Sequence, residues 1–289
     1  MKIQIKNFLG IKGEIELKKL TIFTFRDLLK LVYFLEGNDR SLDRFKALYP
    51  NRGEKDFTIT YQTGKETLQI RQRKRVLYAK PKKVSRTGQK VVMLPANRDV
   101  LLHSNFEFII DLVLNNLQKW GIYLGDIWGE LSKVYPIEDK HLQLLFKFLS
   151  GFQNGTIIIE EPELHLSPNE QMFVVEKIAE TLKNPEISII LFTNSPYILT
   201  KLNNFIYAGD LVAQGFPKET ISKVVPERYW INPEEVEAYA LKIDSESKEI
   251  LSIMGKDEPY LVSYEKLDAI SDSILREFDS LLDVEFPSQ

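Results

Sequence analysis

The stretch GTIIIEEPELHLSP, residues 155–168, carries more information about fold and function than any other part of the chain. Its run of isoleucines predicts a strand that is buried on both faces, as in a parallel sheet. Glu160 and Glu161 end that strand, and a capping box of Ser167 with Glu170 then opens a helix. Because ligands of α/β sheets bind beyond the carboxyl ends of the strands, the stretch predicts two carboxylates at a functional site.

The composition sets the class of protein. The chain has 289 residues, of which 44% are hydrophobic and 27% charged, which is typical of one large globular α/β domain or two modest ones. Its apolar runs are shorter than the ~20 residues that a membrane-spanning helix needs. The opening residues, MKIQIKNFLGIKGEIEL, lack the apolar core of a signal peptide. We therefore expect a cytoplasmic protein that does not use a membrane.

Two kinds of site are disfavoured by residue type. The chain contains no cysteine, which excludes disulfides and thiolate metal sites. Its three histidines, His103, His141 and His165, are scattered and show no ligand spacing. A zinc site is therefore not expected.

Positive charge is concentrated in residues 71–90. This segment holds nine basic residues and no acidic one, whereas the whole chain has a net charge of −3. Subtracting these nine charges leaves a net charge of −12 on the rest. Such asymmetry indicates an anionic partner.

Strands are expected to alternate with helices along the chain. We expect strands at 2–6, 14–23, 56–62, 66–73, 91–95, 156–160 and 187–193, and a strand pair within 203–213. Helices are expected at 26–36, 104–120, 139–150 and 263–283, and starting at 168 and 233. This order predicts an α/β fold with a mainly parallel core sheet flanked by helices, and the segments 56–62 and 66–73 add an antiparallel β-hairpin subdomain.

Read in order, these pieces resemble the head domains of ABC-type ATPases, in particular the SMC-like branch that also supplies the ATPase half of overcoming-lysogenization-defect nucleases. The resemblance rests on five stretches: MKIQIKNFLGIKGEIELKKLTIF (1–23), VVMLPANRDVLL (91–102), IIIEEPELHLSPNEQ (157–171), IILFTNSPYIL (189–199) and INPEEVEAYAL (231–241). It implies a P-loop NTPase-like head that spans 1–289 as a single domain. Within it we expect a β-rich lobe (1–100), a helical part (101–150) and an α/β part with the Walker B strand (151–289).

The resemblance also implies roles for individual residues. Glu160 matches the Walker B acid that supports Mg²⁺, and Glu161 matches the glutamate that activates the attacking water. Asn194 stands where these proteins carry the switch histidine. Asparagine can orient a water molecule but cannot take a proton from it.

The parts that would hold ATP are missing. A phosphate loop needs glycines, a lysine and a Ser or Thr, but LTIFTFRDLLKLV (20–32) joins strand to helix through Thr24 to Asp27 alone. Asp27, if near the site, repels phosphate. The signature position, 136–143, reads PIEDKHLQ and has neither serine nor glycine, and Gly151 is interpreted as a helix stop. We therefore interpret the nucleotide site as degenerate, with ATP and Mg²⁺ not expected as cofactors.

The basic segment has two interpretations, and the sequence alone favours neither. It either contacts nucleic-acid phosphates or is a solvated strand edge whose lysines discourage edge pairing. Tyr78 is the only aromatic residue among the charges, so sequence-specific reading of bases is not expected. The candidate contacts are Arg71, Arg73, Lys74, Arg75, Lys80, Lys82, Lys83 and Arg86.

Three functions remain open. The preferred one is a catalytically inactive ABC/SMC-head-like protein that acts as a binding, scaffold or regulatory subunit. Its partner is an active ATPase homologue, a nuclease or a second copy of itself, and it acts on DNA or RNA through residues 71–90. The second is an active ATPase with a divergent site, and the third is a non-specific nucleic-acid-binding protein.

Overall fold

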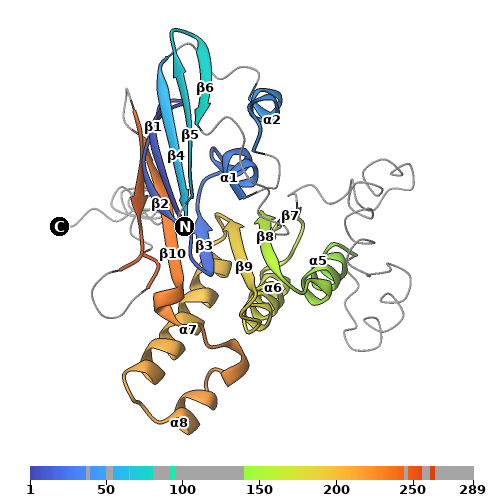
Figure 1. Ribbon diagram of the computed structural model, residues 1–289. Coiled ribbons are helices and arrows are strands. Elements are labelled where there is room, and N and C mark those ends of the chain that lie inside the picture. The colour runs from blue at the N-terminus through green and yellow to red at the C-terminus, as the bar shows by residue number, and fades with distance from the viewer. Residues whose placement is uncertain are drawn as a thin grey trace, which may run out of the picture.

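The chain folds around one mixed β-sheet with helices packed against it (Figure 1). The structure is a computed structural model and describes residues 1–36, 40–49, 55–64, 66–80, 91–94, 140–243, 247–255 and 261–263. Within these residues the sheet has 11 strands in the order β6-β5-β4-β1-β2-β11-β10-β3-β9-β8-β7. An α/β fold is thus confirmed.

The strands and helices have the following bounds. The strands are β1 Lys2–Phe8, β2 Ile11–Glu16, β3 Leu20–Phe23, β4 Phe57–Thr63, β5 Glu66–Arg73, β6 Val76–Lys80, β7 Val91–Leu94, β8 Gly155–Glu160, β9 Ile187–Phe192, β10 Val236–Ile243 and β11 Lys248–Ser252. The helices are α1 Leu29–Glu36, α2 Leu42–Leu48, α5 Lys140–Gly151, α6 Pro168–Thr181, α7 Pro196–Ala213 and α8 Lys218–Ser222, with 3-10 turns η2 Glu227–Tyr229 and η3 Pro233–Glu235.

One half of the sheet is parallel and buried on both faces. Strands β10, β3, β9, β8 and β7 all run in the same direction. Ile157 and Ile159 belong to the core that includes residues of α5, α6 and α7, whereas Ile158 belongs to the core that includes α1. Because both faces are covered, β8 needs apolar residues at successive positions, as its sequence predicted.

The other half, made of β2, β1, β4, β5 and β6, is antiparallel. The expected hairpin is confirmed as β4 and β5, and a further strand, β6, pairs with β5 at the end of the sheet. The hairpin belongs to the same sheet as the parallel strands, since β4 pairs with β1 and β2 pairs with β11. Ile59 and Ile70 pack into the core with α1 and α2, while the alternate residues lie on an open face.

Besides the single strand expected at 14–23, which is divided into β2 and β3 at residues 17–19, two expectations were wrong. The segment 203–213 is not a strand pair but the second half of α7, capped by Ser195, whose side chain accepts a hydrogen bond from the Ile198 N–H. The helix expected from Pro233 is only the 3-10 turn η3, after which the chain enters β10. In both places the deciding interaction is tertiary packing, which local periodicity does not report.

Several expectations fall outside the described residues. These are the helix at 104–120, the segment 81–90 and nearly all of the closing helix at 263–283. The division at 100 and 150 stays a prediction, and β10 and β11 lie between β2 and β3 in the sheet. No helix in the part of the chain that the structure describes is long and apolar enough to cross a membrane.

Candidate functional site

Three parallel strands end side by side at one edge of the sheet. β3, β9 and β8 are neighbours, and Phe192 is level with both Phe23 and Glu160. The residues after these strand ends come from the turn before α1, the loop before α6 and the start of α7. Ligands of α/β sheets bind at such an edge, so the candidate site lies here.

An arginine from the turn before α1 spans the two glutamates. Arg26 Nη2 donates a hydrogen bond to Glu160 Oε1 within an ion pair, and Arg26 Nη1 lies 3.3 Å from Glu161 Oε1. The Glu160 side chain is only 8% exposed, whereas that of Arg26 is 55% exposed. A carboxylate this buried needs a counter-charge, and Arg26 supplies one from within the chain.

The backbone of Glu161 makes this arrangement possible. Its φ is 42°, in the left-handed region that is costly for residues with a Cβ atom. Its N–H still donates to the Phe192 carbonyl at 2.8 Å, so the pairing of β8 with β9 continues to this residue. Consecutive side chains of a strand point to opposite faces. The left-handed turn breaks that alternation, which lets both carboxylates reach one guanidinium.

Glu163 ties the loop after β8 to the end of β9. Its Oε1 accepts hydrogen bonds from Thr193 Oγ1 at 2.9 Å and from the Asn194 N–H at 3.1 Å. Its Oε2 is buried and has no hydrogen-bond partner among the residues that the structure describes. Burial raises the pKa of the Glu163 carboxyl, and the nearby charge of Glu161 raises it further. Asn194 is exposed and enters this network through its backbone.

The turn before α1 is bonded to β10 and β11. The Thr24 N–H and Oγ1 both donate to the Tyr239 carbonyl, at 3.0 and 3.3 Å, and the Leu29 N–H donates to the Arg26 carbonyl at 3.0 Å. Asp27, expected to repel phosphate, forms an ion pair with Lys248 of β11 at 2.5 Å. Both charged residues of the turn are therefore engaged within the chain, and so are two of its backbone N–H groups.

The remaining sequence-predicted positions are placed as follows. Of the signature region, residues 140–143 begin α5, and 136–139 lie outside the described residues. Gly151 ends α5, which agrees with its interpretation as a helix stop. Among the described residues, no group of three or more histidines, aspartates and glutamates is placed to hold a metal ion. The role of Glu160 as a metal ligand therefore stays a prediction.

The described part of the basic segment lies on β5, β6 and the turn between them. Arg71, Arg73, Lys74, Arg75 and Lys80 are all exposed, and Lys82, Lys83 and Arg86 lie outside the described residues. Cross-strand pairing also brings Lys6 of β1 into this group, because Lys6, Thr58, Arg71 and Tyr78 form one row across the sheet. Sequence reasoning missed Lys6, since only the strand order reveals it.

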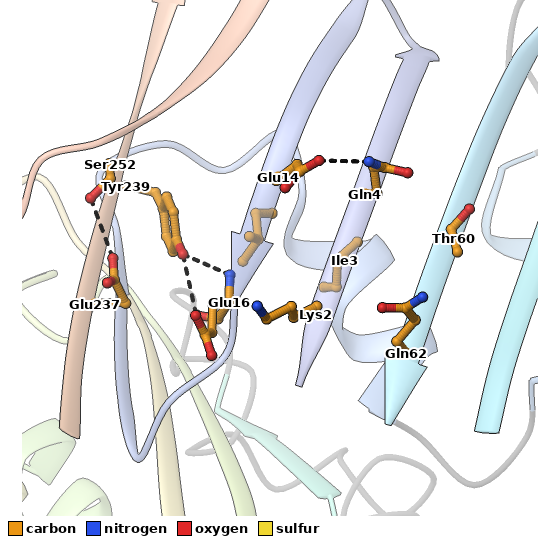
Figure 2. A pocket seen from close by; sticks show the side chains of 11 residues that line it. Lys2, Ile3, Gln4, Glu14, Glu16, Thr60, Gln62, Glu237, Tyr239 and Ser252 are labelled. Carbon is orange, nitrogen blue, oxygen red and sulfur yellow. Dashed lines mark hydrogen bonds between the residues drawn. The ribbon is translucent and has the colours of Figure 1, made fainter. Parts of the chain in front are cut away.

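A second hollow lies on the open face of the sheet, among β1, β2, β4 and β10. It encloses about 330 Å³ (Figure 2). Its polar side chains bond to one another: Gln4 Nε2 donates to Glu14 Oε1 at 2.6 Å, and Ser252 Oγ donates to Glu237 Oε2 at 3.3 Å. Several polar groups of the hollow are thus bonded within it, and the paired glutamates at the strand ends remain the stronger site.

Arg26 is the site residue that sequence reasoning did not identify. The junction LTIFTFRDLL was read for its missing glycines, and its only cation was left without a role. A signal was available, because an arginine in the turn after β3 can reach the acids that end a nearby parallel strand.

Comparison with known proteins gives structural similarity without a sequence match. No family model and no curated protein matches the chain. The chain is similar to the SmcHead bound to the C-winged helix domain of ScpA, with a TM-score of 0.45 and 11% identity over 87% of this chain and 97% of that one. It is also similar to the SMC head domain from Thermotoga maritima, with a TM-score of 0.43 and 10% identity over 88% and 98% of the chains. Stu0660 of Streptococcus thermophilus gives a TM-score of 0.37 at 12% identity over 78% and 86%.

Proposed function

We propose that this chain is an ABC/SMC-head-like protein that does not turn over ATP and acts instead as a binding, scaffold or regulatory subunit. The observation that carries the proposal is the ion pair of Arg26 with Glu160 and Glu161. It lies where the resemblance places Mg²⁺ and the attacking water.

An internal guanidinium changes what the two glutamates can do. In phosphoryl transfer the protein contributes positioning and charge stabilisation, through a phosphate loop, Mg²⁺ and a group that orients water. Here Arg26 already neutralises Glu160, so Mg²⁺ has to displace it from a carboxylate that is 8% exposed. Contacts between phosphates and the turn before α1 would offset the free energy needed to displace Arg26. That turn has no glycine, however, and it is bonded to β10 and β11.

The partner is expected to be a protein, either an active ATPase homologue, a nuclease or a second copy. Active heads of this kind are held together by ATP between two subunits, so a head without ATP needs direct contacts. The loop that follows Glu161 is suited to this, because Glu163 fixes it against β9 and the capping box of Ser167 with Glu170 fixes its end.

The test is thermal unfolding of the full chain with millimolar Mg-ATP. A ligand that binds only the folded state stabilises it by about 2.7 kcal/mol at a hundredfold excess over Kd. We expect no rise in Tm with Mg-ATP relative to Mg-AMP, and no phosphate release above that of the Glu161→Gln variant.

The rival function, an ATPase with a divergent site, predicts the opposite. A clear Mg-ATP-dependent rise in Tm, with phosphate release that is lost in Glu161→Gln, contradicts our proposal. Where the wild type shows no such rise, the Arg26→Gln variant identifies the cause: if Mg-ATP binds only after Arg26 is removed, the ion pair is what blocks the site.

A further inference from the structure

The sheet ends in an open edge strand at β6. Among the described residues, β6 pairs only with β5. An edge strand presents a row of outward N–H and C=O groups that can pair with another chain. Val76 and Tyr78 on this strand are 51% and 54% exposed, although both are large and apolar. The edge lies at the end of the molecule opposite α8 (Figure 1).

The two faces of β6 differ in chemistry. Val76 lies opposite Arg73 and Tyr78 lies opposite Arg71, so these residues share the open face of the sheet. Leu77 is on the other face, where it packs against the core that includes α1 and α2. A strand added beside β6 therefore meets basic side chains on one face and extends an apolar core on the other.

A groove runs along the open face beside this edge. It encloses about 700 Å³ and is lined by residues of β1, β4, β5 and β6, including Lys6, Arg73, Lys74 and Tyr78. Of the described residues that line it, Asp56 alone is acidic, and its Oδ1 accepts a hydrogen bond from the Lys74 N–H. The surface next to β6 is thus strongly positive.

We propose that β6 binds an extended acidic segment of a partner protein, which adds to the sheet as a further strand. Main-chain hydrogen bonds to the edge supply affinity, and alternate side chains supply specificity. On the open face the side chains of the segment lie beside Val76, Tyr78 and Lys80, with Arg71 and Arg73 of β5 one strand further in. We place acidic residues at these alternate positions, where they meet Lys80 and the two arginines. The segment has apolar residues between them, facing Leu77 and Ala79. The inference concerns a surface away from the nucleotide site and does not rest on the function proposed above.

Two other occupants fit less well. A second copy of β6 brings the arginines and lysines of two chains together, and like charges directly opposite each other are destabilising. Single-stranded nucleic acid needs a series of aromatic side chains on which bases stack, and Tyr78 is the only aromatic residue on β6. An amphipathic acidic strand forms main-chain hydrogen bonds with the edge of β6 and also pairs with the basic side chains on its open face.

The experiment uses the full chain and a fluorescent peptide of alternating glutamate and valine. We expect saturable binding, loss of that binding with a peptide of alternating lysine and valine, and slower amide hydrogen exchange at 76–80 in the complex. Replacing Arg71 and Arg73 with glutamine weakens binding about tenfold, since each exposed ion pair contributes up to about 1 kcal/mol. The matched control, Lys218→Gln with Lys223→Gln, removes two exposed charges on and after α8 and leaves affinity unchanged.

Two results overturn the proposal. One is the absence of peptide binding at low salt. The other is binding of a single-stranded oligonucleotide that depends on Arg71 and Arg73 while the peptide gives no protection of the β6 amides, which assigns the surface to nucleic acid. Failure of either kind leaves the Mg-ATP measurements untouched, so the two proposals are tested separately.

Discussion

The guanidinium of Arg26 lies against the Glu160 side chain, which is only 8% exposed. The burial of this carboxylate determines how much stability is lost when Arg26 is replaced. In Arg26→Gln, the charge of Glu160 stays buried without its ion-pair partner. We expect the free energy of unfolding to fall by about 1 to 3 kcal/mol, less than for a fully buried pair because Arg26 itself is half exposed. Urea-induced unfolding at neutral pH measures this change.

A double variant separates the ion pair from packing. If charge is the cause, adding Glu160→Gln to Arg26→Gln restores most of the lost stability, because the buried charge that lost Arg26 is then absent. Replacing Thr200, an exposed residue of α7, with alanine is the surface control and changes stability by no more than about 0.5 kcal/mol. Equal losses in the single and double variants contradict the ion-pair explanation.

Glu163 predicts a pH dependence of stability with a definite sign. Burial raises the pKa of its carboxyl in the folded state above the ordinary value of 4.5, and the Glu161 charge adds to this. The neutral form therefore contributes stability that is fully present below that value and is lost as pH rises through the raised pKa.

The variant Glu163→Gln has no such titration. The stability of wild type minus that of the variant is thus expected to fall as pH rises from about 4 and to level off above the raised pKa. Denaturant unfolding of both proteins over this range gives the difference, and other titrating groups such as Glu36 are common to both. A difference that stays constant with pH shows that Glu163 titrates alike in the folded and unfolded chain.

At this scale the sequence identified the acids but not their partner. Glu160 and Glu161 could be predicted because a buried strand must end where polar residues begin. The left-handed backbone of Glu161 and the reach of Arg26 depend on the register of β8 with β9 and of β9 with β3. That register becomes known only when strands distant in sequence are placed together.

Helix α7 shows why one element was misread. Its sequence, PYILTKLNNFIYAGDLVA, contains Gly209, which resembles a turn signal between two strands. In the structure Gly209 instead allows close packing: a Cβ atom added there lies 2.0 Å from the Ile231 carbonyl oxygen. The Ile231 N–H also donates a hydrogen bond to the Phe205 carbonyl at 3.1 Å, which holds the backbone of Ile231 against α7.

This contact yields a prediction for the element. Gly209→Ala improves helix propensity but forces the backbone at Ile231 to move, so we expect a loss of about 2 kcal/mol or more in unfolding free energy. Asn204→Ala, at an exposed position of the same helix, is the control and changes stability by no more than about 0.5 kcal/mol. Far-ultraviolet circular dichroism during thermal unfolding measures both. A neutral or stabilising Gly209→Ala contradicts the close packing.

Elements that are determined by residues close together in the sequence were predicted well. The capping box that opens α6 involves only Ser167 and Glu170, and both of its hydrogen bonds are present, at 2.7 and 3.4 Å. The hairpin of β4 and β5 is likewise set by alternation on each side of a short turn. Strand β10 was missed because its place between β11 and β3 is decided by long-range pairing.

At the scale of the molecule, one sheet joins two regions of different character. The parallel half is buried on both faces and ends in the glutamate pair, while the antiparallel half carries the exposed basic residues. The strand order β2-β11-β10-β3 connects them through strands from the C-terminal part of the chain. Sequence order alone suggested a separate hairpin subdomain, because it does not show where β10 and β11 are inserted.

The last prediction concerns assembly. The heads that the sequence resembles are held together by ATP between two subunits. The proposed function assigns the positions of Mg²⁺ and phosphate to the Arg26 ion pair and the bonded turn before α1. We therefore expect the molar mass from light scattering to be the same with and without Mg-ATP, both for the wild type and for Glu161→Gln. A mass that doubles only when Mg-ATP is present, and more completely in Glu161→Gln, shows dimerisation around nucleotide and contradicts the proposed function.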